Sequence, residues 1–265
     1  MEQNLTPVWR WVACGLWLAL ALGLARVGHT QSDQGAITVF AASSLTNAFK
    51  EIGPAIQRAH PEHPVRFNFG ASSALRSQIQ LGAPADVFAS ADYEQMEPLR
   101  KAGLVSAPVT FARNRLTVVV PKGNPGKLSS PRDLARPGLR LVTAAGAVPI
   151  GRYTQEVLGK LGQEPGYPAG YAARVNQNVV SREPNVRAVL AKVELGEADA
   201  AVVYETDARA STRVKSIPIP ETANVIAEYP VAVVAASANK SAAEAFVRVL
   251  RSNGAREILK QHGFR

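Results

Sequence analysis

Residues 41–49 read AASSLTNAF, and residues 69–79 read FGASSALRSQI. Each stretch places a cluster of small residues and serines between an apolar run and a segment of helical periodicity. In open α/β sheets, ligands bind at such junctions, where the carboxyl end of a strand leads into a helix. The two stretches therefore predict two binding positions, neither of which carries a cation or an obvious nucleophile at the junction itself.

The chain around these junctions alternates short apolar runs with amphipathic segments. The runs ITVFAA at 37–42, VRFNF at 65–69 and ADAAVVY at 198–204 are typical of strands. Segments 45–60 and 184–196 carry apolar residues at helical spacing. This alternation predicts an α/β protein built on parallel sheets.

Two apolar crossings, near 116–121 and 214–231, separate a middle block from the two ends of the chain. They predict a two-lobed protein, with residues 36–117 and 218–265 in the first lobe and residues 118–217 in the second. Two strands that link two lobes form a hinge with a central cleft between the lobes.

The N-terminal segment has the three-part layout of a secretory signal. A short polar start with Arg10 leads into about fifteen apolar residues and ends in small ones, so we expect a signal peptide over residues 1–25 and export to the periplasm. The apolar run is short for a membrane-spanning helix of ~20 residues, although a retained anchor stays an alternative. The single cysteine, Cys14, leaves no disulfide framework and no cysteine-rich metal site.

Charge and motifs exclude several classes of function. The formal net charge is +9, but the basic residues are scattered singly and do not alternate with aromatic ones, which argues against nucleic-acid binding. No G-x-S-x-G, P-loop or dinucleotide-binding motif occurs. His60 and His63 are flanked by prolines that favour a helix exit over a helical metal pair. The sequence therefore predicts a binding protein and not an enzyme.

The residues alone suggest five places for the binding site, each at a strand end or a helix start. Ser44 and either Ser72 or Ser73 are expected to cap helix starts, Pro149–Gly151 and Asn185–Val186 stand at the starts of two further helices, and Tyr204 ends a strand. Helix starts expose unpaired N–H groups and half a positive charge each, so four of them would supply about two charges to an anion. The plainer interpretation stays open: serine is an ordinary cap, and Tyr204 would be a core residue.

Longer segments carry a resemblance to a known family. ITVFAASSLTNAFKEI, GASSALRSQIQLGAPADVFASAD, VPIGRYTQEVLGKLG, SREPNVRAVLAKVELGEADAAVVY and YPVAVV together resemble the periplasmic molybdate-binding proteins of ABC importers. The resemblance covers residues 37–264 in order. It implies the two-lobed type II fold of periplasmic binding proteins, which closes on a tetrahedral oxyanion.

The resemblance also implies a ligand and a set of contacts. Molybdate or tungstate would be the only metal species, held by main-chain N–H groups of Ser44, Ser72, Ile150 and Val186 and by the hydroxyls of Ser44, Ser72 and Tyr204. No cofactor is implied, the protein is expected to act as a monomer, and the partner is a membrane permease. Sulfate, another tetrahedral dianion, stays the alternative ligand.

Two features depart from the family pattern. Ile150 stands where members often have alanine, which leaves the N–H in place but bears on cleft closure. The segment from Gln163 to Ser181 is longer than in some members, and we expect it to lie on the surface as a loop.

Overall fold

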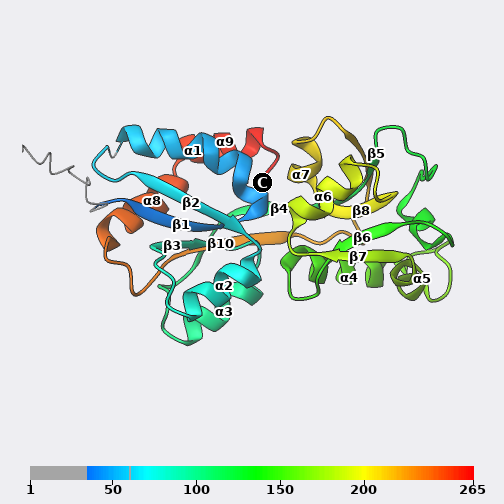
Figure 1. The fold of residues 1–265 in the computed structure, drawn as a ribbon, viewed down its shortest axis with the longest axis horizontal. Coiled ribbons are helices and arrows are strands. Elements are labelled where there is room, and N and C mark those ends of the chain that lie inside the picture. The colour runs from blue at the N-terminus through cyan, green and yellow to red at the C-terminus, as the bar shows by residue number, and fades with distance from the viewer. Residues whose placement is uncertain (1–34, 60) are drawn as a thin grey trace, which may run out of the picture. The chain divides into compact units, whose positions relative to one another are not determined.

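The structure is a computed structural model that describes residues 35–59 and 61–265. The predicted signal segment, residues 1–25, and His60 lie outside the described residues. The described residues form two five-stranded sheets with helices on both faces of each, as the alternating pattern predicts (Figure 1). None of the helices in this part of the chain is long and apolar enough to cross a membrane.

The first sheet has the strand order β2-β1-β3-β10-β4. Its strands are β1 (Ile37–Ala42), β2 (Val65–Gly70), β3 (Val87–Ala89), β4 (Val109–Asn114) and β10 (Ala227–Val233). β1 pairs in parallel with β2 and β3, whereas β10 is antiparallel to β3 and β4. The late strand β10 lies inside the sheet, so the chain returns to this lobe after building the other one.

Side chains of β1 alternate between two hydrophobic clusters, one on each face of the first sheet. Val39 packs on one side and Phe40 on the other. The helices on the first face are α1 (Thr46–Ala59), α8 (Lys240–Leu250) and α9 (Asn253–Gln261). The helices on the second face are α2 (Ser72–Gln80) and α3 (Tyr93–Lys101). Burial on both faces is the reason why the central strands read as continuous apolar runs.

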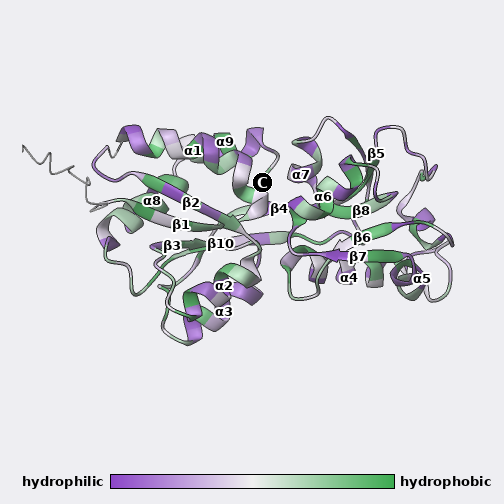
Figure 2. Ribbon diagram, in the orientation of Figure 1, coloured by the Kyte–Doolittle hydropathy of each residue, from purple (hydrophilic) through white to green (hydrophobic). Residues whose placement is uncertain are grey.

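The second sheet has the order β7-β6-β8-β5-β9. Its strands are β5 (Leu116–Pro121), β6 (Leu141–Ala144), β7 (Val179–Glu183), β8 (Ala200–Tyr204) and β9 (Val214–Pro218). Its helices are α4 (Pro149–Leu161), α5 (Tyr171–Gln177), α6 (Val186–Glu194) and α7 (Glu205–Arg209), with a 3-10 turn at Pro131–Ala135. Every residue of β6 and β8 is buried, and both strands are largely hydrophobic in Figure 2.

The chain passes between the two sheets twice. One passage is the single residue Arg115 between β4 and β5, and the other is segment 219–226 between β9 and β10. The side chain of Asn224 ties the passages together: its Oδ1 accepts from the backbone N–H of Leu116 at 3.1 Å, and its Nδ2 donates to the carbonyl of Leu116 at 2.9 Å. Two linked crossings form a hinge. The lobe boundaries drawn from the sequence stay a prediction.

The expected surface loop from Gln163 to Ser181 is wrong in part. The segment contains helix α5 and the start of β7, and Tyr171 and Val175 of α5 are buried. The Tyr171 hydroxyl donates to the carbonyl of Pro131 at 2.5 Å, which fixes the helix on the 3-10 turn. A helix of seven residues carries too few turns to show a clear period, and β7 is an edge strand whose burial is only partial. Strand β4 was missed for the same reason of partial burial.

Gly151 and Gly159 of α4 provide a test of how this helix packs. A Cβ at Gly151 would lie 2.3 Å from the carbonyl oxygen of Ala145, whereas a Cβ at Gly159 meets nothing within 4 Å. We expect Gly151→Ala to lower the free energy of unfolding by ~1–3 kcal/mol through overpacking. Gly159→Ala should raise it by ~0.5–1 kcal/mol, because alanine favours a helix. Chemical denaturation measures both, and equal effects would contradict the packing described.

Candidate functional site

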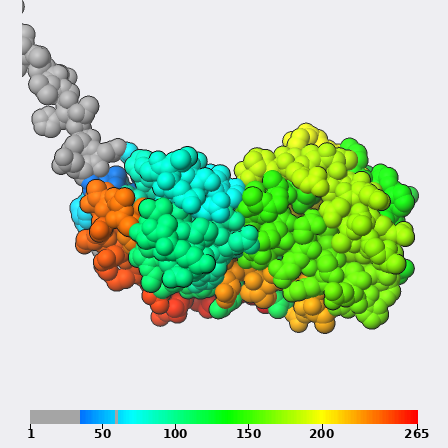
Figure 3. Space-filling model, turned by 90° about the horizontal axis from the view of Figure 1, so that it is seen from below, coloured from blue at the N-terminus to red at the C-terminus, as the bar shows by residue number. Residues whose placement is uncertain are grey.

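One cavity lies between the two sheets, at the carboxyl ends of the parallel strands of each sheet. Its lining comes from residues that follow or end six of these strands: Ala42, Ser43, Ser44, Gly70, Ala71, Ser72, Ala91, Val148, Pro149, Ile150, Val186 and Tyr204. The cavity is small, with a volume of about 10 Å³. The lobes meet along a boundary that Figure 3 shows between the teal and orange surface of the first lobe and the green surface of the second.

The structure brings all five sequence-predicted site residues into this cavity. Ser44 and Ser72 come from the first lobe, and Ile150, Val186 and Tyr204 come from the second. All five are only 1–3% exposed. Of the other lining residues, Ala91 ends the apolar run ADVFASA at 85–91, which contains β3. The sequence could have indicated Ala91, because it stands just after a strand. That these residues hold a ligand stays a prediction.

Helix starts surround the cavity with backbone N–H groups. Ser44 lies in the 3-10 turn that opens α1, Ser72 is the first residue of α2, Ile150 is the second of α4, and Val186 is the first of α6. The first N–H groups of a helix have no partner within the helix and point out beyond its N-terminus. The helix starts of α2 and α4 also lack a side-chain cap, so their N–H groups are available to a ligand.

The expected capping roles of Ser44 and Ser72 are wrong. Both serines lie inside the first helical turn: Ser44 is two residues past the capping position Ala42, and Ser72 is one residue past the capping position Ala71. Their hydroxyls instead bond to other elements. Ser44 Oγ lies 3.0 Å from the hydroxyl of Tyr229, and Ser72 Oγ accepts from the backbone N–H of Ala91 at 3.0 Å.

The third hydroxyl at the cavity, that of Tyr204, is buried and has no hydrogen-bond partner among the described residues. Burial raises the pKa of Tyr204 well above its ordinary value of 10, so the hydroxyl keeps its proton at neutral pH. A buried polar group without a partner costs free energy. The Tyr204 O–H is therefore a donor that lacks its acceptor.

Among the described residues, no lysine, arginine, histidine, aspartate or glutamate lines the cavity. Arg187, directly after Val186, is held elsewhere: its Nε lies 2.9 Å from Asp207 Oδ1, and its Nη2 donates to Asn47 Oδ1 at 3.1 Å. Burial raises the pKa of Asp207 to about 6, against the opposing effect of Arg187. The nearby cation is thus matched by a carboxylate and does not serve as a counter-ion in the cavity.

A second arginine joins the two lobes beside the cavity. Arg152 of α4 donates through Nη2 to Asp92 Oδ2 at 3.1 Å, and its Nε lies 2.7 Å from Glu94 Oε2. Gln95 of the same lobe donates to the carbonyl of Ala147 at 3.2 Å. Burial raises the pKa of Asp92, and the bond from Arg152 opposes that rise. Sequence reasoning singled out none of these residues, because their partners are more than fifty positions away.

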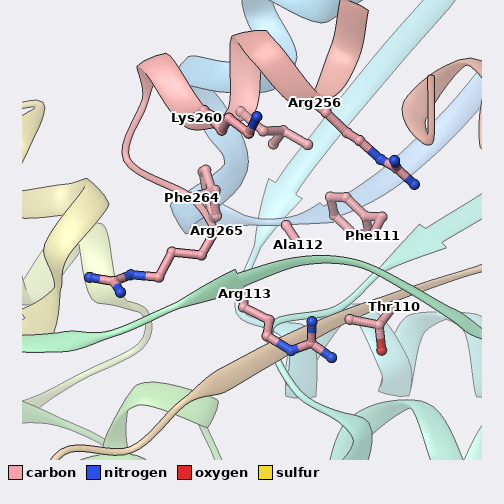
Figure 4. Close-up of a pocket in the computed structure, with 9 residues that line it drawn as sticks. Thr110, Phe111, Ala112, Arg113, Arg256, Lys260, Phe264 and Arg265 are labelled. Atoms are coloured by element: carbon pink, nitrogen blue, oxygen red, sulfur yellow. The ribbon is translucent and has the colours of Figure 1, made fainter. Parts of the chain in front are cut away.

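A larger cavity, with a volume of about 260 Å³, lies between β4 and α9. Figure 4 shows its basic residues Arg113, Arg256, Lys260 and Arg265 around the aromatic residues Phe111 and Phe264. Arg113 pairs with Glu228 at 2.9 Å, Lys260 with Glu257 at 2.7 Å and Arg265 with Glu205 at 3.8 Å, so three of these four cations already have carboxylate partners. It lies within the first lobe and away from the strand ends, which makes it a weaker candidate for enclosing a compact anion.

A cavity between two α/β lobes, lined by helix starts, is characteristic of a protein that encloses a small solute. Residues 37–265 match the family model described as bacterial extracellular solute-binding protein, and the chain belongs to that family. A molybdate-binding protein ModA of Mycobacterium bovis is 39% identical over 255 residues, which cover 96% of this chain and 92% of the relative.

Solved structures agree on the fold. A periplasmic molybdate-binding protein of Azotobacter vinelandii superposes with a TM-score of 0.75 at 22% identity, covering 86% of this chain and 98% of that one. The sulfate-binding protein SubI of Mycobacterium tuberculosis superposes with a TM-score of 0.76 at 24% identity, covering 87% and 86%. The expected α/β fold of a two-lobed type II periplasmic binding protein is confirmed. In the described residues, no group of three or more His, Cys, Asp or Glu side chains could hold a metal ion.

The Arg152 contacts predict a measurable effect on the distance between the lobes. With Cys14 replaced by serine, spin labels at Lys101 on α3 and Lys160 on α4 report that distance. We expect Arg152→Ala to broaden the distance distribution toward longer values, because an ion pair with a buried carboxylate across the lobes is lost. Arg248→Ala, which removes an exposed pair within α8, is the control. An unchanged distribution for Arg152→Ala would show that the bridge does not hold the lobes together.

Proposed function

We propose that this protein binds molybdate, and tungstate as well, through Ser44, Ser72, Ile150, Val186 and Tyr204. The observation that carries the proposal is the cavity itself, which offers backbone N–H groups and hydroxyls but no charged side chain. Four helix starts supply about two positive charges, which matches a dianion. The 39% identity to the molybdate-binding protein of Mycobacterium bovis supports the choice of ligand.

The donor-only lining favours a fully ionised oxyanion over phosphate. Monohydrogen phosphate carries a proton that requires an acceptor, and a carboxylate is the usual one. None of the described residues that line the cavity is a carboxylate, and Tyr204 keeps its proton. Molybdate, tungstate and sulfate need donors only, so the chemistry of the lining suits all three.

Sulfate is the second candidate ligand. The structural likeness to the sulfate-binding protein SubI favours it, and sulfate has the same charge and tetrahedral geometry as molybdate. The two differ chiefly in size. The identity to a relative named as molybdate-binding is higher, 39% against 24%, and on that ground molybdate is preferred.

The remaining parts of the proposal concern the cellular role. Membership of the extracellular solute-binding family supports export to the periplasm and a binding role without catalysis. We propose delivery of the bound oxyanion to the membrane permease of an ABC importer, by a monomer that needs no cofactor. The predicted signal peptide over residues 1–25 belongs to this proposal.

A thermal-shift series across molybdate, tungstate, sulfate and phosphate tests the ligand. A ligand that binds only the native state, present at 100 times its Kd, stabilises that state by ~2.7 kcal/mol. For a chain of this size the melting temperature should rise by roughly 5–10 °C. We expect the rise with molybdate and tungstate and none with phosphate. A rise with sulfate alone would favour the second candidate, and no rise with any of the four would contradict the proposal.

Tyr204→Phe separates ligand binding from structural stability. The Tyr204 hydroxyl has no partner in the described structure, so its removal should leave the melting temperature of the ligand-free protein unchanged or slightly higher. Molybdate binding should weaken by ~1–3 kcal/mol, because a hydrogen bond to a charged group is lost. Isothermal titration calorimetry measures the second effect. Unchanged affinity would remove Tyr204 from the site.

A further inference from the structure

Tyr229, on strand β10, is wholly buried behind the cavity and does not line it. Its hydroxyl lies 3.0 Å from Ser44 Oγ, across 185 positions of the chain. We propose that Tyr229 is a positioning residue, whose hydroxyl donates to Ser44 Oγ and so turns the proton of Ser44 into the cavity. The inference rests on the proposed function, because it explains how the same cavity offers only hydrogen-bond donors to an oxyanion.

The direction of the bond follows from Asn114, the last residue of β4. The backbone N–H of Arg115 donates to Asn114 Oδ1 at 3.0 Å, which fixes the amide so that Nδ2 faces the other way. That Nδ2 donates to Thr206 Oγ1 at 2.8 Å and to the hydroxyl oxygen of Tyr229 at 3.4 Å. The Tyr229 oxygen thus accepts from Asn114, and its own proton has Ser44 Oγ as its acceptor.

The Tyr229 hydroxyl has a proton to donate. Burial raises its pKa above the ordinary value of 10, so the hydroxyl keeps its proton at neutral pH. A serine hydroxyl has one proton and two acceptor lone pairs. Once Ser44 Oγ accepts from Tyr229, its own proton is left for a further partner, and the neighbouring acceptor would be an oxyanion in the cavity.

The second serine of the site is held by the same kind of contact. Ser72 Oγ accepts from the backbone N–H of Ala91 at 3.0 Å, which also leaves its proton for the cavity. The backbone N–H of Ala91 thus donates to Ser72 Oγ as the Tyr229 hydroxyl is proposed to donate to Ser44 Oγ. With Tyr204 unpartnered, the three hydroxyls then present three protons to the ligand.

The ring of Tyr229 has a separate role. It packs edge-on against Phe264, with ring centroids 5.4 Å apart, and against Tyr204 at 5.9 Å. The substitution Tyr229→Phe keeps these ring contacts and removes only the hydroxyl. The hydroxyl and the ring can therefore be tested independently.

The test compares the affinities of wild type and Tyr229→Phe for molybdate and phosphate by calorimetry. We expect about a tenfold rise in the Kd for molybdate, which corresponds to ~1.4 kcal/mol. The preference for molybdate over phosphate should fall, because a freely rotating Ser44 hydroxyl can accept the proton of monohydrogen phosphate. Tyr171→Phe is the matched control: it also loses a buried tyrosine bond, to Pro131, but lies away from the cavity. It should lower the melting temperature and leave affinity and preference unchanged.

A double-mutant cycle with Ser44→Ala decides whether Tyr229 acts through Ser44. If it does, the double variant binds molybdate as Ser44→Ala alone does, within about twofold. Additive losses, or an unchanged Kd for Tyr229→Phe, would overturn the inference while leaving the proposed function in place. If wild type binds none of the four oxyanions in the thermal-shift series, the proposed function fails and the inference fails with it.

Discussion

The first turn of a helix leaves backbone N–H groups without partners, and in this protein four helices begin around one cavity. The pairing of the strands and the two crossings between the sheets bring these helix starts together. Parallel pairing of β1 with β2 and β3, and of β6 with β7 and β8, brings strand ends to one edge of each sheet. The two crossings between the sheets then set those edges against each other.

Two arginines near the cavity, Arg187 and Arg152, contact other protein groups and do not line the cavity. Arg187 follows the cavity-lining Val186 in sequence, yet Asp207 and Asn47 hold its guanidinium. Arg152 is in the first turn of α4 and reaches Asp92 and Glu94 of the other lobe. Both cations therefore stabilise the arrangement of the lobes, while helix starts line the cavity. A site of this kind has no bulky cation that must be desolvated when the lobes close.

Much of the site could be predicted from the sequence, because strand ends and helix starts leave local patterns. Ser44, Ser72, Ile150, Val186 and Tyr204 each stand at such a junction, and the structure brings all five together. The serine capping roles were predicted wrongly, since a shift of one or two residues in the helix start turns a cap into a first-turn residue.

The contacts that orient the site could not be predicted. The bond between Ser44 and Tyr229 joins residues 185 positions apart, and no local period marks it. The same holds for the Arg152 bridge and for the Asn114 amide, whose partners are set by how the sheets meet. Helix α5 was missed because seven residues give little periodicity. Local pattern thus indicates which groups line the cavity, but the packing between the sheets decides how they are oriented.

The most direct test of the central claim is a crystal structure of the protein grown with molybdate, with molybdenum located by its anomalous scattering. The account predicts molybdenum in the cavity between the lobes, with its oxygens about 2.7–3.1 Å from the N–H groups of Ser44, Ser72, Ile150 and Val186. Molybdenum held by guanidinium or ammonium groups, for example at Arg256 of α9, would contradict it.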